Sequence, residues 1–317
     1  MLKKINELKR EKAIKKITGN LGYVIEDGDR LICYVKRERI FKQDRFPNEL
    51  YVISLRDYKK ENMDLVEKYD LNKEIVYVLD GLTFGKREPV VIEDYDNIFE
   101  VEIKNCRFDD GLAISKPKKC TIRNTVSSND YFISENIIKA DELIMDNVGI
   151  NINDRVHLLN EVTICASNLL KIMNSQIKAD TCRIGSIKTK KLCIENSTLE
   201  ARSNIYINAR NLISKNSKAI SNHRINVFVK FYDKACGLLL NASYIYVNDV
   251  LLRKEDNGVS IYLRPLNDLD KQRKVLINCL KEIKDNFEEK RDETLIRVKE
   301  NYNSQPVGKV LLRGKDR

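Results

Sequence analysis

The chain has 317 residues, of which 33% are charged and 42% are hydrophobic, and its formal net charge is +10. No apolar run approaches the roughly 20 residues that a membrane-spanning helix needs, so we expect no transmembrane segment. The N-terminus is basic but has neither an apolar central segment nor a cleavage site, which argues against a secretory signal. We therefore expect a soluble cytoplasmic protein that does not associate with membranes.

Residues 1–74 are expected to form a small N-terminal α+β cap. An imperfect apolar stripe among lysines indicates a helix over residues 1–18, which carries seven Lys or Arg against two Glu through Asn20. Strand signals begin at Leu21, with a hairpin turn expected at Asp27 and Gly28. A further helix is expected near Lys59 to Tyr69.

The middle of the chain repeats a pattern of an apolar residue, any residue, an asparagine and a small residue. The clearest copies are IKNC at 103–106, IRNT at 122–125, IMNS at 172–175 and IENS at 194–197. With weaker copies included, the asparagines are Asn105, Asn124, Asn147, Asn174, Asn196, Asn216 and Asn241. Their spacings lie between 19 and 27 residues, a period typical of a solenoid.

The two best copies indicate what each repeat forms. Apolar residues alternate before the asparagine, as in Leu170 and Ile172, and alternate again after it, as in Ile177 and Ala179. Asparagine tolerates the left-handed backbone region, so it can make a tight corner between two strands. Three short strands in about 22 residues predict a parallel β-helix over residues 75–264. Its first corner is expected in LDGLTF at 79–84, where glycine replaces asparagine.

This pattern resembles the asparagine ladder of right-handed parallel β-helix proteins, which include many polysaccharide lyases and pectinases. The resemblance is one of architecture, covers about half of the chain and includes no active-site motif. Stacked asparagines can hydrogen-bond to one another along a column, so the resemblance implies a structural role for them. Bactofilin-type β-helices differ from this chain because their repeats are glycine-rich and they polymerise through their ends.

Residues 265–303 are expected to form a long helix, and residues 304–317 a tail with one strand-like run at 309–312. The helix carries a heptad stripe made by Leu269, Leu276, Leu280, Ile283 and Phe287. Two interpretations remain open. The stripe could fold back onto the solenoid, or it could pair with a helix of another chain and so make an oligomer or partner interface.

Basic residues recur in phase with the asparagines. Lysines lie eight, six and five residues before both Asn124 and Asn196, and Lys or Arg lies at matching offsets before Asn147 and Asn216. The resulting ridge consists of Lys116, Lys118, Lys119, Lys139, Lys188, Lys190, Lys191 and Arg210. Such a ridge could bind the phosphates of a nucleic acid, or it could only keep exposed corners soluble. It lacks the interleaved aromatic residues that stack on bases.

Enzymatic chemistry has little support in the sequence. The eight cysteines form no CxxC pair and only two histidines are present, so neither a metal site nor a cofactor is expected. Two acidic pairs, Asp94 with Asp96 and Asp109 with Asp110, lie in turn segments, and no other candidate catalytic residue accompanies them. We therefore expect no catalytic residues.

The sequence favours a non-enzymatic β-solenoid scaffold. On this interpretation the chain forms a homo-oligomer or binds another protein through its C-terminal helix. The alternative is a polyanion-binding module whose partner is nucleic acid and whose surface is the lysine ridge.

Overall fold

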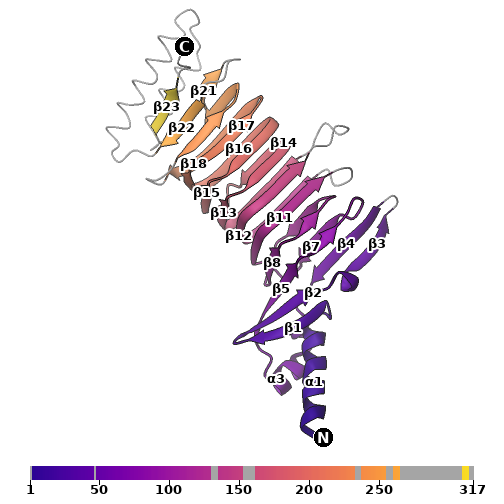
Figure 1. Cartoon of the computed structure of the whole chain (residues 1–317). Helices are drawn as coiled ribbons and strands as arrows, with labels where there is room; N and C mark the ends of the chain where they lie inside the picture. The colour runs from indigo at the N-terminus through magenta and orange to yellow at the C-terminus, as the bar shows by residue number, and fades with distance from the viewer. Residues whose placement is uncertain are drawn as a thin grey trace, which may run out of the picture. The chain divides into compact units, whose positions relative to one another are not determined.

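The computed structural model describes residues 2–45, 48–129, 135–152, 161–232, 237–254, 260–264 and 309–313. The structure is mostly β, with 64% strands, and the described residues contain few helices. The strands build a β-solenoid of about seven turns, which confirms the predicted solenoid (Figure 1). The chain divides into two compact units, Met1–Ile144 and Met145–Arg317, and each is described by itself.

The first unit contains the described helices and the first solenoid strands. Its helical elements are α1 (Leu2–Ile17), η1 (Arg37–Arg39), α2 (Tyr58–Glu61) and α3 (Met63–Tyr69). Its strands are β1 (Gly22–Asp27), β2 (Arg30–Val35), β3 (Phe41–Arg45), β4 (Asn48–Leu55), β5 (Glu74–Asp80), β6 (Thr83–Phe84), β7 (Val90–Asp94), β8 (Glu100–Lys104), β9 (Arg107–Phe108), β10 (Leu112–Ser115) and β11 (Lys119–Asn129).

Among the described residues, the second unit is built from strands. β12 (Glu135–Ile152) begins in the first unit and ends in the second. The remaining strands are β13 (Glu161–Met173), β14 (Gln176–Gly185), β15 (Lys191–Glu195), β16 (Thr198–Lys215), β17 (Ser217–Ser221), β18 (Arg224–Tyr232), β19 (Leu238–Asn241), β20 (Tyr244–Val247), β21 (Val250–Lys254), β22 (Ser260–Arg264) and β23 (Lys309–Arg313).

In the first unit, each coil contributes a strand to each of three parallel ladders. One ladder runs β2, β5, β8, β11, a second runs β6, β9, β11, and a third runs β4, β7, β10, β12. Leu79 pairs with Ile103 and Phe84 with Phe108, so the alignment of LDGLTF with IKNCRF is confirmed. Gly81 has φ +66° and takes the corner, as predicted.

The second unit repeats the same three-strand coil. Leu170 pairs with Leu192, Ile172 with Ile194, Ile177 with Leu199 and Ala179 with Ala201, which confirms the ungapped alignment of the two best repeats. The third strand of each coil pairs β14 with β16 and β16 with β18 (Figure 1). β18 pairs in the same way with β20.

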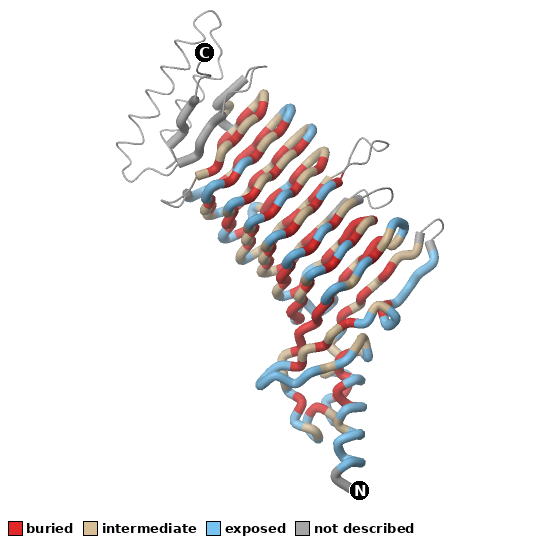
Figure 2. The backbone as a smooth tube through the Cα atoms, in the orientation of Figure 1, coloured by how far each residue is buried: buried red, intermediate tan, exposed pale blue. Residues whose placement is uncertain are grey.

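The core of each unit is a stack of the inward residues of successive coils. In the second unit one such column consists of Leu170, Leu192 and Leu212, and all three are fully buried. Figure 2 shows buried residues alternating with more exposed ones along the strands. Because neighbouring strands lie about 4.8 Å apart, each coil buries its apolar side chains against the coils on either side, and no coil has a core of its own.

Left-handed asparagines make the corners between the first and second strands. Six of the seven predicted corner asparagines, all except Asn241, have φ between 47° and 55°. Their exposed side chains form ladders within each unit. Asn124 Nδ2 donates to Asn105 Oδ1 at 3.3 Å in the first unit, and Asn196 and Asn216 each donate to the preceding asparagine at 3.3 Å in the second.

The prediction that Asn241 makes a corner is wrong. Asn241 lies in β19, where it pairs with Ile220 in the second strand of the preceding coil. Ser217 pairs with Leu238, so the corner register falls on Gly237. The apolar alternation around Asn241 imitates a repeat because any solenoid strand alternates in the same way.

A second, buried ladder joins the coils where the residue after the asparagine carries a hydroxyl group, which is the case at Thr125, Ser175, Ser197 and Ser217. Ser175 and Ser197 each accept a hydrogen bond at 3.1 Å, from the backbone N–H of Val148 and of Ser175 respectively. Ser217 accepts one from the Ser197 N–H at 3.3 Å. These hydroxyl groups also donate to carbonyl groups, as Ser197 does to Glu195 at 2.7 Å. The corner amides, which no sheet ladder pairs, are thereby satisfied in the interior.

Antiparallel strands cover the outer strands of the parallel stack in each unit. In the first unit β1 pairs antiparallel with β2, and β3 with β4. In the second unit β21 pairs antiparallel with β20, β22 with β19, and β23 with β22. The strand expected in the tail is thus present, and it belongs to this covering layer.

Four expectations concern the ends of the chain. The hairpin turn falls on Gly28 and Asp29, one residue later than predicted, because Asp27 pairs with Arg30. The helix expected near 59–69 is two short helices, since Asn62 between them has φ −133°. Parallel pairing includes β2 and β4, which precede residue 75. The long helix expected at 265–303 lies outside the described residues.

The buried hydroxyl ladder predicts which corner substitutions destabilise the protein. Ser197→Ala removes the acceptor of the Ser175 N–H, so the free energy of unfolding should fall by about 1–3 kcal/mol. Ser197→Thr keeps the hydroxyl, which Thr125 supplies at a natural corner, and should stay within about 1 kcal/mol of the parent. Urea denaturation followed by circular dichroism measures both. Equal destabilisation of the two variants would contradict the ladder.

Candidate functional site

The acidic pairs that could have served an enzyme hold loops in place. Asp94 is buried, and its carboxylate accepts hydrogen bonds from four backbone N–H groups between Asp96 and Phe99, at 2.8–3.2 Å. Burial raises the pKa of Asp94, although these donors act in the opposite direction. Asp96 accepts from the Asp57 N–H at 2.8 Å. Both carboxylates therefore accept hydrogen bonds from backbone N–H groups.

The second acidic pair is divided between surface and interior. Asp109 accepts from Arg107 Nε at 2.6 Å, whereas Asp110 is only 1% exposed. The two carboxylates thus do not share one accessible surface. Neither pair offers the converging arrangement that acid–base catalysis needs.

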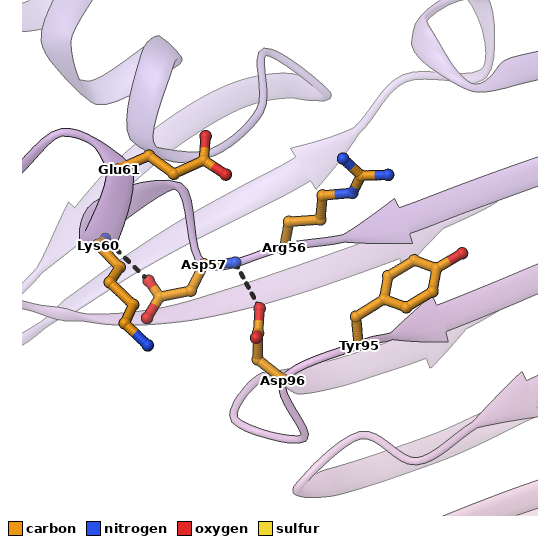
Figure 3. A pocket seen from close by; sticks show the side chains of 6 residues that line it. All are labelled: Arg56, Asp57, Lys60, Glu61, Tyr95 and Asp96. Atoms are coloured by element: carbon orange, nitrogen blue, oxygen red, sulfur yellow. Dashed lines mark hydrogen bonds between the residues drawn. The ribbon is translucent and has the colours of Figure 1, made fainter.

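One open cavity lies in the first unit, next to the Asp96 loop. Its volume is about 310 Å³, and its lining consists of Arg56, Asp57, Lys60, Glu61, Tyr95 and Asp96 (Figure 3). Arg56 stacks over the Tyr95 ring, with Cζ 5.6 Å from its centroid, and Asp57 caps α2 through the Lys60 N–H at 3.2 Å. Charges of both signs line the cavity, and the two aspartates accept hydrogen bonds from backbone N–H groups. We assign it no chemistry.

Three of the cysteine thiols lie fully buried in the core. Cys33, Cys120 and Cys182 are buried, and desolvation raises the pKa of each to about 12. Among the residues that the structure describes, no group of three or more His, Cys, Asp or Glu side chains could hold a metal ion. None of the described helices is long and apolar enough to cross a membrane.

The predicted lysine ridge is divided between the units, and its first half is compensated by acids. Lys118 Nζ lies 3.2 Å from Glu74, and Lys119 Nζ lies 3.4 Å from Glu100. The Lys116 N–H donates a hydrogen bond of 2.9 Å to the backbone carbonyl of Lys139 in the next coil. The residues that follow Lys139 and stack on this corner are Asp141 and Glu142, so basic and acidic side chains alternate there.

The second half of the ridge has no such compensation. Lys188, Lys190, Lys191 and Arg210 are all exposed, and none forms an ion pair with another described residue. The backbone N–H groups of Arg210 and Asn211 bond to Thr189 and Lys190, which places Arg210 on Lys190 in the next coil. Register then places Lys230 on Arg210. We call the set Lys188, Lys190, Lys191, Arg210 and Lys230 the basic corner.

A surface beside the basic corner carries arginines and tyrosines. It is the outward side of the third strands in β14, β16, β18 and β20, whose inward residues, such as Ile205, Ile225 and Ile245, are fully buried. We call its outward residues the arginine–tyrosine face; they are Arg183, Asn204, Tyr206, Arg224, Asn226, Tyr244 and Tyr246.

Neither Lys230 nor this face was predicted from the sequence. Lys230 lies seven residues before the corner at Gly237, an offset that no residue of the predicted ridge has, and only the strand register places it on Arg210. The face combines residues about 20 positions apart, and only the strand register brings Tyr206, Asn226 and Tyr246 into one column. An alignment of the third-strand segments NIYIN at 204–208, RINVF at 224–228 and YIYVN at 244–248 contains the signal for it. The expected interface residues Leu269, Leu276, Leu280, Ile283 and Phe287 lie outside the described residues.

Comparisons with protein-family models, curated proteins and solved structures find no match to this chain.

The raised thiol pKa values predict resistance to alkylation. A pKa of about 12 lowers the thiolate fraction at pH 8 by about a thousandfold relative to an ordinary cysteine. Cys33, Cys120 and Cys182 should therefore remain unmodified by iodoacetamide in the native protein and react after unfolding. Site-resolved mass spectrometry measures this. Native-state labelling of these three cysteines at the rate seen in the unfolded chain would contradict their burial.

Proposed function

We propose that this protein is a non-enzymatic β-solenoid scaffold, which self-associates or docks a protein partner through its heptad-patterned segment. The observation that carries this proposal is that the side chains which could have served catalysis have structural roles instead. Asp94 and Asp96 hold backbone, and Cys33, Cys120 and Cys182 belong to the core. What the described strands offer to a partner is a rigid surface with side chains at fixed spacing.

The covering strands support association through a surface other than the coil ends. A bare terminal coil would present unpaired strand edges, which template end-to-end growth. Here β3 covers β4 with Lys42 and Asp44 on its edge, and β22 with β23 covers β19. Charged residues on an edge strand disfavour further pairing. An appended segment is the better candidate for self-association.

The structure also fixes where the heptad-patterned segment is attached. Arg264 pairs with Lys309, so the residues between β22 and β23 leave and return at neighbouring positions. An internal change in this segment can therefore keep the β22–β23 pairing, whereas truncation after Pro265 would remove β23. The test uses internal substitutions for this reason.

Self-association through the stripe predicts a change of mass on substitution. Leu280→Asp with Ile283→Asp places charges on the apolar stripe, so an oligomer should dissociate to a monomer. Val275→Asp with Ile277→Asp changes apolar residues outside the stripe and should keep the parent's mass. Light scattering after gel filtration measures the mass, and circular dichroism checks that β-structure is retained. A parent that is monomeric without a partner protein, or a stripe variant that keeps the oligomeric mass, would contradict self-association.

A second candidate function is polyanion binding, and the basic corner favours it. Lys190, Arg210 and Lys230 follow one another in successive coils, at the strand spacing of about 4.8 Å. Like charges at this spacing repel one another, and a bound polyanion would relieve that repulsion. The acids that neutralise the first half of the ridge have no counterpart among these described residues.

Binding at the basic corner predicts a salt-dependent loss on charge reversal. Lys190→Glu, Arg210→Glu and Lys230→Glu together should weaken binding of heparin by about tenfold or more at about 50–100 mM salt. The matched control reverses three exposed lysines of α1, Lys4, Lys9 and Lys12, which changes the net charge equally. Fluorescence anisotropy with labelled heparin measures both. Equal losses in the two variants would point to net charge alone and contradict a defined corner.

A further inference from the structure

The arginine–tyrosine face is a flat, ordered surface with two side-chain columns. Register stacks Arg183, Tyr206, Asn226 and Tyr246 in one column and Asn204, Arg224 and Tyr244 in the next. The strands that carry them, β14, β16 and β18, lie side by side in Figure 1. The tyrosines and Arg224 are partly exposed, and Arg183 is exposed.

Cation–π contacts hold the side chains of this face in order. The Arg183 guanidinium lies over the Tyr206 ring, with Cζ 4.5 Å from the centroid, and Arg224 lies over the Tyr246 ring at 5.1 Å. His223 meets the Tyr244 ring edge-on at 5.3 Å. These contacts restrict the arginines, so a ligand that stacks on them loses less conformational entropy.

One polar atom of the face has no partner within the described chain. Arg224 Nε is buried and makes no hydrogen bond to any residue that the structure describes. A buried donor left unsatisfied costs about 1–3 kcal/mol.

The arginine–tyrosine face carries positive charge, as does the basic corner beside it. The outward residues of strands 204–208, 224–228 and 244–246 include no acid; they are Asn204, Tyr206, Asn208, Arg224, Asn226, Phe228, Tyr244 and Tyr246. Glu161, at the far end, is paired with Arg183. The strands lead directly into Arg210 and Lys230 of the basic corner. Aromatic, amide and cationic groups thus border an uncompensated row of cations.

We propose that the arginine–tyrosine face binds single-stranded nucleic acid. Bases stack on Tyr206, Tyr246 and the guanidinium of Arg183, while phosphates contact the basic corner. Stacking on aromatic rings is tolerant of sequence, and phosphate contacts carry no sequence information, so binding is expected without sequence preference. This proposal rests on the second candidate function, because it assumes that the basic corner attracts a polyanion.

The geometry favours a single strand over a duplex. Neighbouring coils repeat at about 4.8 Å, whereas the phosphates of one strand in B-DNA advance by about 3.4 Å along the axis. A flexible single strand can stretch to match the coils, and a stacked duplex cannot. The face also has no helix or protruding ribbon that could enter a major groove.

The test compares ligands that share phosphates but differ in bases. The probes are a labelled oligothymidylate of about 20 nucleotides, an abasic strand of the same length and a duplex of the same length. The parent should bind oligothymidylate about tenfold or more tightly than the abasic strand, and more tightly than the duplex. Equal binding of the two single strands, or tighter binding of the duplex, would overturn the proposal.

The matched variants separate the face from the basic corner. Tyr206→Leu with Tyr246→Leu should bring the affinity for oligothymidylate down to that for the abasic strand and leave heparin binding unchanged. Tyr23→Leu with Tyr34→Leu removes a stacked tyrosine pair of the first unit, with centroids 4.8 Å apart, and should change neither. Thermal unfolding monitored by circular dichroism identifies any variant that fails to fold.

The experiments distinguish a failure of base stacking on the face from a failure of polyanion binding at the basic corner. If Tyr206→Leu with Tyr246→Leu keeps the parent's preference for bases, the face is not the site, although the basic corner can still bind heparin. If heparin and every oligonucleotide fail to bind, both the polyanion function and this proposal are wrong. Binding of a neutral oligosaccharide to the face without binding of oligothymidylate would also overturn the proposal.

Discussion

The corner between the first and second strands of each coil is the constraint on which the rest of the structure depends. An asparagine in the left-handed region turns the chain, and in four coils the residue after it, Thr125, Ser175, Ser197 or Ser217, places a hydroxyl group in the interior. That hydroxyl group accepts a hydrogen bond from a backbone N–H of the preceding coil, as Ser197 does from the Ser175 N–H. The asparagine thus sets the direction of the chain and the serine sets its register. Because a shift of one residue would turn every inward side chain outward, this register also fixes the core.

Because the coils are in register, the outward residues of successive coils form columns on the surface. Outward positions repeat at the strand spacing, so residues about 20 apart in sequence become neighbours, as Lys190, Arg210 and Lys230 do. The columns differ between the units: lysines of the first unit pair with Glu74 and Glu100, whereas those of the basic corner have no described acidic partner. The loop-holding carboxylates of Asp94 and Asp96, the buried thiols and this basic column are the observations on which the proposed partner-binding functions rest.

Much of this fold could be predicted from the sequence, because the asparagine period and the alternation of apolar residues are local signals. The corner at Gly81 and the alignment of Leu170 with Leu192 followed from them. The error at Asn241 has the same origin, since alternation in β19 imitates a repeat where glycine holds the corner. The covering strands were not predictable as such, because antiparallel pairing of β22 with β19 is a long-range contact. The arginine–tyrosine face was missed for the same reason: its columns exist only in the register.

Hydrogen exchange at the corner amides tests this account most directly. The N–H groups of Ser175 and Ser197 belong to no sheet ladder, and they donate hydrogen bonds to buried hydroxyl groups of the next coil. They should therefore exchange as slowly as the amides of the neighbouring strand at residues 192–194, as measured by NMR or by mass spectrometry with short peptides. Exchange at the rate of an exposed turn would show that the corners are ordinary loops and that the coils are not joined through them.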